Sequence, residues 1–203
     1  SDTESLFGIG YVHGTGQILY SSDKGGNEND HIYLLNEDGT STDLTPGEAV
    51  KASFSGFSLD KKVIYLLSNK RDARFFDLYR MNVGEWKEEM VWENSMGLEY
   101  AGASRDRSII AMVKPITTSE SQLFIHDLAT GETKEVSEPG MPGMYSASGF
   151  TNDNAWFFYT TDAGREFSYL MRYSPATGER ELLYETSWDV TGSWLSRNEN
   201  TSS

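Results

Sequence analysis

Short apolar runs, each bounded by polar turn residues, recur along the whole chain. Between residues 154 and 185 the runs are Trp156–Thr161, Tyr169–Ser174 and Glu181–Tyr184, with turns rich in Asp, Gly and Pro between them. Runs of this length with such turns predict β-strands joined by tight connections. Similar trios of runs occur over 17–45, 63–92 and 109–136.

The trios follow one another at a constant spacing. The second run opens at Ile32, Leu78, Leu123 and Leu170, which are 46, 45 and 47 residues apart. The turn glycines Gly39, Gly84, Gly131 and Gly178 are 45, 47 and 47 residues apart. A period of about 46 residues is typical of repeats that each form one four-stranded propeller blade.

A further run of different character precedes each trio. These runs are rich in Gly, Ala and Ser, and they occupy 7–12, 53–58, 100–104, 146–151 and 191–195. Because small residues weaken a strand, their recurrence needs a reason. We interpret it as crowding, since the innermost strand of a propeller blade lines a narrow central channel.

The expected fold is therefore an all-β propeller in one partial domain that covers residues 1–203. Its four consecutive four-stranded antiparallel blades are expected over 7–45, 53–92, 100–137 and 146–185. The run at 191–195 is then the inner strand of a further blade. A lone inner strand indicates that the four blades belong to a larger ring.

Composition excludes several classes of function. The 203 residues carry a net charge of −14, which argues against nucleic acid as a partner, and against anionic membrane surfaces for the same reason. No apolar run approaches the ~20 residues that span a bilayer. The chain has no cysteine, so disulfides and thiolate chemistry are excluded. The sequence does not determine the cellular compartment of the protein, and a periplasmic or secreted location is slightly favoured over the cytoplasm.

Several repeated pieces carry a family resemblance. The chain resembles the amino-terminal propeller of prolyl oligopeptidase-type serine peptidases, and it is similar to the propeller of TolB. The stretch Tyr184–Val190 looks more like the peptidase version. The other matching pieces are Ser22-Asp23-Lys24-Gly25-Gly26, Ile32-Tyr33, Leu78-Tyr79, Asp127-Leu128-Ala129-Thr130-Gly131-Glu132 and Pro175-Ala176-Thr177-Gly178-Glu179.

The resemblance implies a propeller that covers the active-site mouth of an α/β-hydrolase domain and filters peptide substrates. The catalytic domain itself is absent from these 203 residues, and the nucleophile motif Gly-x-Ser-x-Gly occurs nowhere in them. No catalytic residue, metal ligand or cofactor is assigned. The implied partners are a peptide substrate or a hydrolase domain of the parent chain.

Other candidates for chemistry have simpler interpretations. His13, His31 and His126 are expected to be surface or packed histidines, because no triad can be inferred from strands a blade apart. The pair Glu88-Glu89 is expected on a solvated outer strand. The loop Asn27–Asp30 could hold calcium through its oxygen ligands, but a turn is the favoured interpretation.

Two loops between second and third strands share an arginine beside an aromatic residue. These are Arg74 with Phe75 and Phe76, and Arg165 with Phe167. Arg74, Phe75, Arg165 and Phe167 are our candidate binding residues, since this combination is common in contact surfaces. The alternative is a salt bridge from each arginine to a neighbouring acid, between blades.

Three functions remain open at this stage. The first is the non-catalytic propeller of a prolyl oligopeptidase-type peptidase, which gates and helps to bind peptides. The second is a TolB-like interaction propeller outside any enzyme. The third, a propeller enzyme with a central metal such as a lactonase, is disfavoured because the inner strands lack carboxylates and imidazoles at their centres. Unpaired strands would also allow the chain to self-associate.

Overall fold

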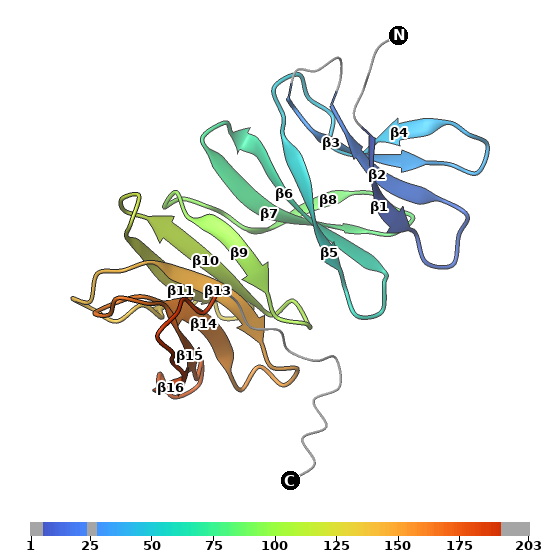
Figure 1. Cartoon of the computed structure of the whole chain (residues 1–203). Helices are drawn as coiled ribbons and strands as arrows, with labels where there is room; N and C mark the ends of the chain where they lie inside the picture. The colour runs from blue at the N-terminus through green and yellow to red at the C-terminus, as the bar shows by residue number, and fades with distance from the viewer. Residues whose placement is uncertain (1–5, 24–27, 192–203) are drawn as a thin grey trace. The chain divides into compact units, whose positions relative to one another are not determined.

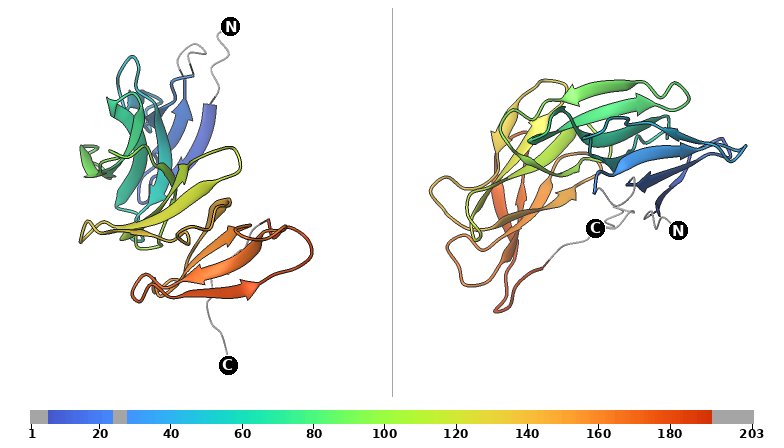
Figure 2. Two further views of the ribbon diagram at one scale, coloured as in Figure 1. Left: turned by 90° about the vertical axis from the view of Figure 1, so that its left-hand side faces the viewer. Right: turned by 90° about the horizontal axis from the view of Figure 1, so that it is seen from above.

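The structure is a computed structural model, and it describes residues 6–23 and 28–191. Sixteen strands in these ranges form four sheets of four antiparallel strands, and no helix is present among the same residues. In each sheet the strands lie in chain order (Figure 1). Figure 2 shows the same strands side by side in two further views.

The first two sheets span residues 6–92. The first contains β1 (Leu6–Tyr11), β2 (Ile18–Ser22), β3 (His31–Leu35) and β4 (Ser41–Asp43). The second contains β5 (Ala52–Phe57), β6 (Val63–Asp72), β7 (Phe75–Asn82) and β8 (Glu88–Trp92).

The other two sheets span residues 99–184. The third contains β9 (Glu99–Ala103), β10 (Ile109–Pro115), β11 (Ser121–Asp127) and β12 (Thr133–Glu135). The fourth contains β13 (Tyr145–Phe150), β14 (Phe157–Thr161), β15 (Tyr169–Tyr173) and β16 (Arg180–Tyr184). The predicted all-β fold of four consecutive four-stranded blades is confirmed.

The inner strands β5, β9 and β13 end one residue earlier than predicted. Ser58, Ser104 and Thr151 follow these strands, and each hydroxyl accepts a hydrogen bond from the backbone N–H five residues later, at 3.0 Å. Each hydroxyl also donates to the Asp two positions on, at 2.6–2.7 Å. Ser58, Ser104 and Thr151 therefore each begin a turn closed by the following Asp and do not belong to the strand.

The glycines of the inner strands lie at a repeated β-bulge. One extra residue, Ile9, Ser55, Ala101 or Ser148, interrupts the register between each inner strand and its neighbour. The next residue is a glycine with φ between 137° and 156°. A Cβ on Gly10 or Gly102 would meet no atom within 4 Å. The backbone conformation of the bulge favours glycine at these positions, and crowding of the small residues in a central channel stays a prediction.

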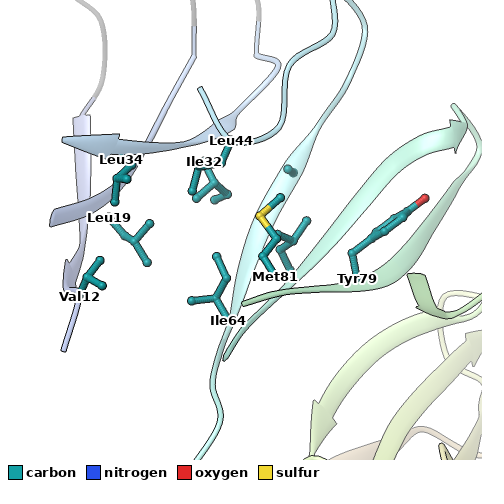
Figure 3. Packing of buried hydrophobic residues seen from close by; sticks show 10 residues of the cluster. Val12, Leu19, Ile32, Leu34, Leu44, Ile64, Tyr79 and Met81 are labelled. Atoms are coloured by element: carbon teal, nitrogen blue, oxygen red, sulfur yellow. The ribbon is translucent and has the colours of Figure 1, made fainter. Parts of the chain in front are cut away.

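Residues 1–97 and 98–203 form two compact units, which are described separately. In the first unit, Leu19, Ile32 and Leu34 from one sheet pack against Ile64 and Met81 from the next (Figure 3). All five side chains are at most 2% exposed. β6 begins with five apolar or aromatic residues in a row, Val63-Ile64-Tyr65-Leu66-Leu67, as expected of a strand in a sheet that is buried against its neighbour.

In the second unit the core is more aromatic. Phe157, Tyr159 and Tyr173 of the fourth sheet pack against Ile109, Leu123 and other apolar residues of the third. The rings of Phe157 and Phe150 are 4.6 Å apart. Aromatic rings bury a large apolar area, so this interface is a major source of stability for the unit.

The structure does not test the further inner strand, the larger ring or the domain limits. The further inner strand at 191–195 lies outside the described residues, apart from Thr191. Membership of a larger ring and the limits of the domain stay predictions. Over 6–23 and 28–191, no helix is long and apolar enough to cross a membrane.

Candidate functional site

Three loops of the second unit surround a solvent-open cavity of about 680 Å³. They are the β10–β11, β12–β13 and β14–β15 connections, which contribute Glu120, Met141, Pro142, Asp162 and Arg165 among others. A second cavity of about 420 Å³ also borders Glu120 and Met141, and its lining adds Ile116, Glu138 and Tyr145. We call the two cavities together the loop groove. Its size is within the range of small-ligand and peptide sites.

The segment 138–144, which borders both cavities, is held by hydrogen bonds from its neighbours. The Tyr145 hydroxyl donates to the Met141 carbonyl at 3.0 Å and accepts from the Glu138 N–H at 3.3 Å. The Asp162 carboxylate accepts from the Met144 N–H at 2.7 Å. A Cβ on Gly143 would lie 2.7 Å from the Ala163 Cα, so the two loops touch backbone to backbone. The groove is thus built on a positioned loop.

The lining of the loop groove is acidic with apolar patches. Glu120, Asp162 and Glu166 line the larger cavity, while Glu135 and Glu138 line the smaller one. Arg165 pairs with Glu185, and its guanidinium lies 4.1 Å from the centre of the Tyr169 ring. This arrangement presents carboxylates beside Met and Pro side chains, which suits a ligand that is both basic and apolar.

The candidate binding residues are placed in different ways. Arg165 lines the loop groove, whereas Phe167 is half-buried and is not part of its lining. Arg74 lies in the other unit, on the β6–β7 turn, where it binds Asp72 through two nitrogens at 2.7 and 3.0 Å. Its guanidinium also lies 5.0 Å from the centre of the Phe75 ring.

Each arginine therefore has an acidic partner within its own sheet and not between sheets. Asp72 ends β6, and Glu185 follows β16. Whether these residues bind a ligand stays a prediction. The sequence pattern did not single out residues 138–143 as site residues, although their Pro and Gly content is typical of a long ordered connection.

The histidines form contacts of ordinary kinds. His31 is buried, and its Nδ1 lies 2.8 Å from an Asp43 oxygen. His126 lies 2.8 Å from the Thr133 hydroxyl, and burial lowers its pKa despite the nearby Asp127. His13 is exposed. No group of three or more His, Asp or Glu side chains is placed to hold a metal within the described residues.

We expected both glutamates of the pair Glu88-Glu89 on β8 to be solvated, but only one of the two side chains is well exposed. Glu88 is only 15% exposed in its side chain, and it binds Lys70 at 2.5 Å. Glu89 binds Arg80 at 2.8 Å and is well exposed. The strand therefore carries paired charges. The Asn27–Asp30 loop falls partly outside the described residues; Asn29 donates to the Glu48 carbonyl at 3.3 Å.

Asp106 joins the turns of two neighbouring sheets in the second unit. It accepts hydrogen bonds from Ser104, from Ser108 and, across to the next sheet, from the Asn154 amide at 3.0 and 3.1 Å. Partial burial alone would raise the pKa of Asp106, but these hydrogen bonds outweigh it and lower the pKa to about 2.

We expect Asn154→Gly to raise the pKa of Asp106, because the substitution removes the cross-sheet donor. Glycine tolerates the positive φ of 59° at this position, so backbone strain does not confuse the result. The folded pKa lies below the unfolded value near 3.8, so the stabilisation is present above pH ~4 and is lost as pH falls toward 2. Carboxyl NMR titration measures the pKa; an unchanged value in the variant would contradict this assignment. Asn152→Gly is the matched control.

The four sheets, which share one register and one bulge, define a β-propeller protein of repeated blades. The chain matches no family model and no curated protein sequence. Solved structures show the fold. TolB from Acinetobacter baumannii is 16% identical with a TM-score of 0.55, over 92% of this chain and 45% of that one.

Prolyl peptidases have the same fold. Prolyl oligopeptidase B from Galerina marginata is 13% identical with a TM-score of 0.64, over 92% of this chain and 27% of that one. A structure from a study of two prolyl endopeptidases is 15% identical with a TM-score of 0.57, over 91% and 30%. This chain therefore has the propeller fold found in TolB and prolyl oligopeptidases, and it spans less than half the length of each of these three.

Proposed function

We propose that this chain is the non-catalytic propeller portion of a prolyl oligopeptidase-type serine peptidase, where it gates and helps to bind peptide substrates. The observation that carries the proposal is the fold similarity to prolyl oligopeptidase B over 92% of the chain, with a TM-score of 0.64. That Galerina protein is bound to a 25mer macrocyclization substrate. The peptidase-like stretch Tyr184–Val190 supports the same choice.

The decisive experiment uses the natural full-length protein. A fluorophosphonate probe labels activated serines, and the intact mass is measured with and without it. A mass at least ~25 kDa above that of this chain, the rough size of one added domain, with one probe bound, supports the proposal. Prior treatment with an unlabelled serine-directed inhibitor should abolish the label. The isolated 203-residue chain should neither be labelled nor hydrolyse peptides.

A TolB-like interaction propeller is the second candidate. It is favoured by the similarity to TolB, whose TM-score of 0.55 is close to those of the peptidases. In that case the full-length protein takes no fluorophosphonate label and recovers a stoichiometric protein partner. The labelling result therefore separates the two candidates.

Within the peptidase proposal, we assign the loop groove as the peptide contact. Its carboxylates predict that a basic, proline-containing decapeptide binds better than an acidic one. Replacing Glu120 and Glu166 by Gln together should weaken binding about fivefold, at roughly 0.5 kcal/mol for each exposed charge contact. Fluorescence anisotropy with the labelled decapeptide measures this.

The control for that experiment carries the same charge change elsewhere. Glu99 on β9 and Glu179 on the β15–β16 turn are exposed and lie outside the groove, and the control variant replaces both of them by Gln. It should leave the affinity within error of the unmodified chain. Equal losses in the groove and control variants would show that only overall charge attracts the peptide, and would remove the groove from the proposal.

A further inference from the structure

One short turn borders both cavities of the loop groove. It is formed by Glu138-Pro139-Gly140-Met141, in which the Met141 N–H donates to the Glu138 carbonyl at 3.1 Å. Proline stands at its second position, and the glycine at its third has a φ of 76°. These residues and this backbone conformation are typical of a type II turn. We call these four residues the groove turn; Gly140 and Met141 line both cavities.

The Tyr145 hydroxyl closes the groove turn from the core side. It accepts from the Glu138 N–H at 3.3 Å and donates to the Met141 carbonyl at 3.0 Å, so it bridges the first and last residues of the turn. Tyr145 is only 3% exposed. Burial raises the pKa of its hydroxyl, which therefore stays protonated and able to donate at neutral pH. One buried group thus satisfies both ends of the turn.

The Tyr145 ring and backbone are fixed by the core of the second unit. The ring stacks on Tyr159 with 6.2 Å between their centres, and both belong to the cluster between the third and fourth sheets. The Ser121 hydroxyl at the start of β11 accepts from the Tyr145 N–H at 2.9 Å and donates to the Tyr145 carbonyl at 3.2 Å. A firmly held side chain therefore presents its hydroxyl to the groove turn.

The Met141 side chain extends from the turn toward a second loop. It packs on the core of the second unit, and it lies over the Gly164 backbone, where an added Cβ would be 2.9 Å from the Met141 Cε. Gly164 belongs to the β14–β15 connection, so Met141 joins two of the three loops that surround the larger cavity. A shift of the groove turn would move this side chain and change the shape of both cavities.

We propose that Tyr145 is a positioning residue of the loop groove: its hydroxyl holds the groove turn in the conformation that binds peptide. This inference rests on the proposed function of the groove as the peptide contact. A loop that is already ordered loses little conformational entropy when its ligand binds. Without the hydroxyl, the groove turn is in place in only a fraction of the molecules, and the apparent affinity falls by that fraction.

Tyr145→Phe tests the proposal because it removes the hydroxyl and keeps the ring. We expect the labelled basic, proline-containing decapeptide to bind about fivefold more weakly in fluorescence anisotropy. The Glu138 amide proton loses its acceptor, so it should exchange faster with solvent in NMR spectra. Tyr173→Phe is the matched control, since Tyr173 is also 3% exposed in the same cluster and its hydroxyl lies beside Gly178 in the β15–β16 connection. The control should change neither result.

Gly140→Ala disturbs the same turn from its solvent side. An L side chain is strained at the φ of 76°, although its Cβ would meet no atom within 4 Å. The variant should reproduce both effects of Tyr145→Phe, the weaker peptide binding and the faster exchange of the Glu138 amide. Gly131→Ala is its matched control, because Gly131 has a φ of 73° and equal room in the β11–β12 connection. This control should bind the decapeptide like the unmodified chain.

Three outcomes would overturn the positioning role while the groove stays the proposed peptide contact. They are unchanged affinity in Tyr145→Phe, a loss of affinity without faster exchange at Glu138, and an equal loss in Tyr173→Phe. A decapeptide that does not bind the unmodified chain overturns this inference together with the assignment of the groove. The peptidase proposal is tested separately, by the fluorophosphonate label on the full-length protein.

Discussion

Asp77→Ala is expected to reduce the free energy of unfolding of the first unit by about 2–3 kcal/mol, chiefly because a buried backbone N–H loses its charged acceptor. The Asp77 side chain is fully buried on β7. It accepts from the Arg71 guanidinium at 2.7 and 2.9 Å and from the Asn94 N–H at 2.7 Å. Without the carboxylate, the buried N–H loses its partner and the cation loses its counter-charge. Urea denaturation followed by tryptophan fluorescence measures the loss.

The same hairpin supplies the control for Asp77. Asp72 binds Arg74, whose side chain is 76% exposed, so solvent screens this pair. Asp72→Ala removes one carboxylate from the same β6–β7 hairpin and should shift the urea midpoint far less. If the two variants lose equal stability, the network around Asp77 does not hold β7 to the segment at Asn94.

Phe157→Ala is expected to cost the second unit about 3–5 kcal/mol, as large-to-small core substitutions do. Phe157 is fully buried between the third and fourth sheets, with the rings of Phe150 and Tyr159 at 4.6 and 6.3 Å. The neighbouring sheets cannot close fully around the space that is left. Near-ultraviolet circular dichroism and urea denaturation report the loss.

Leu182→Ala provides the comparison for Phe157. Leu182 belongs to the same sheet but is 39% exposed on β16. Its truncation should change the free energy of unfolding by about 0.5 kcal/mol or less. A similar loss in both variants would mean that the interface between the third and fourth sheets is not the main support of this unit.

The candidate site was less accessible to prediction than the fold. Arg165 could be named because an arginine beside an aromatic residue stands out in a loop. The partners that define its surroundings, Met141, Pro142 and Asp162, come from other connections, so nothing local in the sequence joins them. Phe167 follows its arginine by two residues, as Phe76 does, but nothing local in the sequence tells whether such a ring lines the groove.

The fold class could be predicted because each blade is a local unit. Alternating apolar runs, turn residues at constant intervals and a period of about 46 residues encode the four sheets without any long-range information. The turn motif of Ser or Thr followed two residues later by Asp is also local, since its hydrogen bonds close within five residues.

Other features were decided by tertiary structure, because they depend on pairing between strands. The inner-strand glycines could be read from sequence as small residues, but the bulge they occupy exists only once two strands are in register. Likewise, the sequence supplies apolar residues on both faces of every sheet. Which face is covered depends on the neighbour that each sheet meets, and this determines that Phe157 is core while Phe158, one residue away, faces out of the unit.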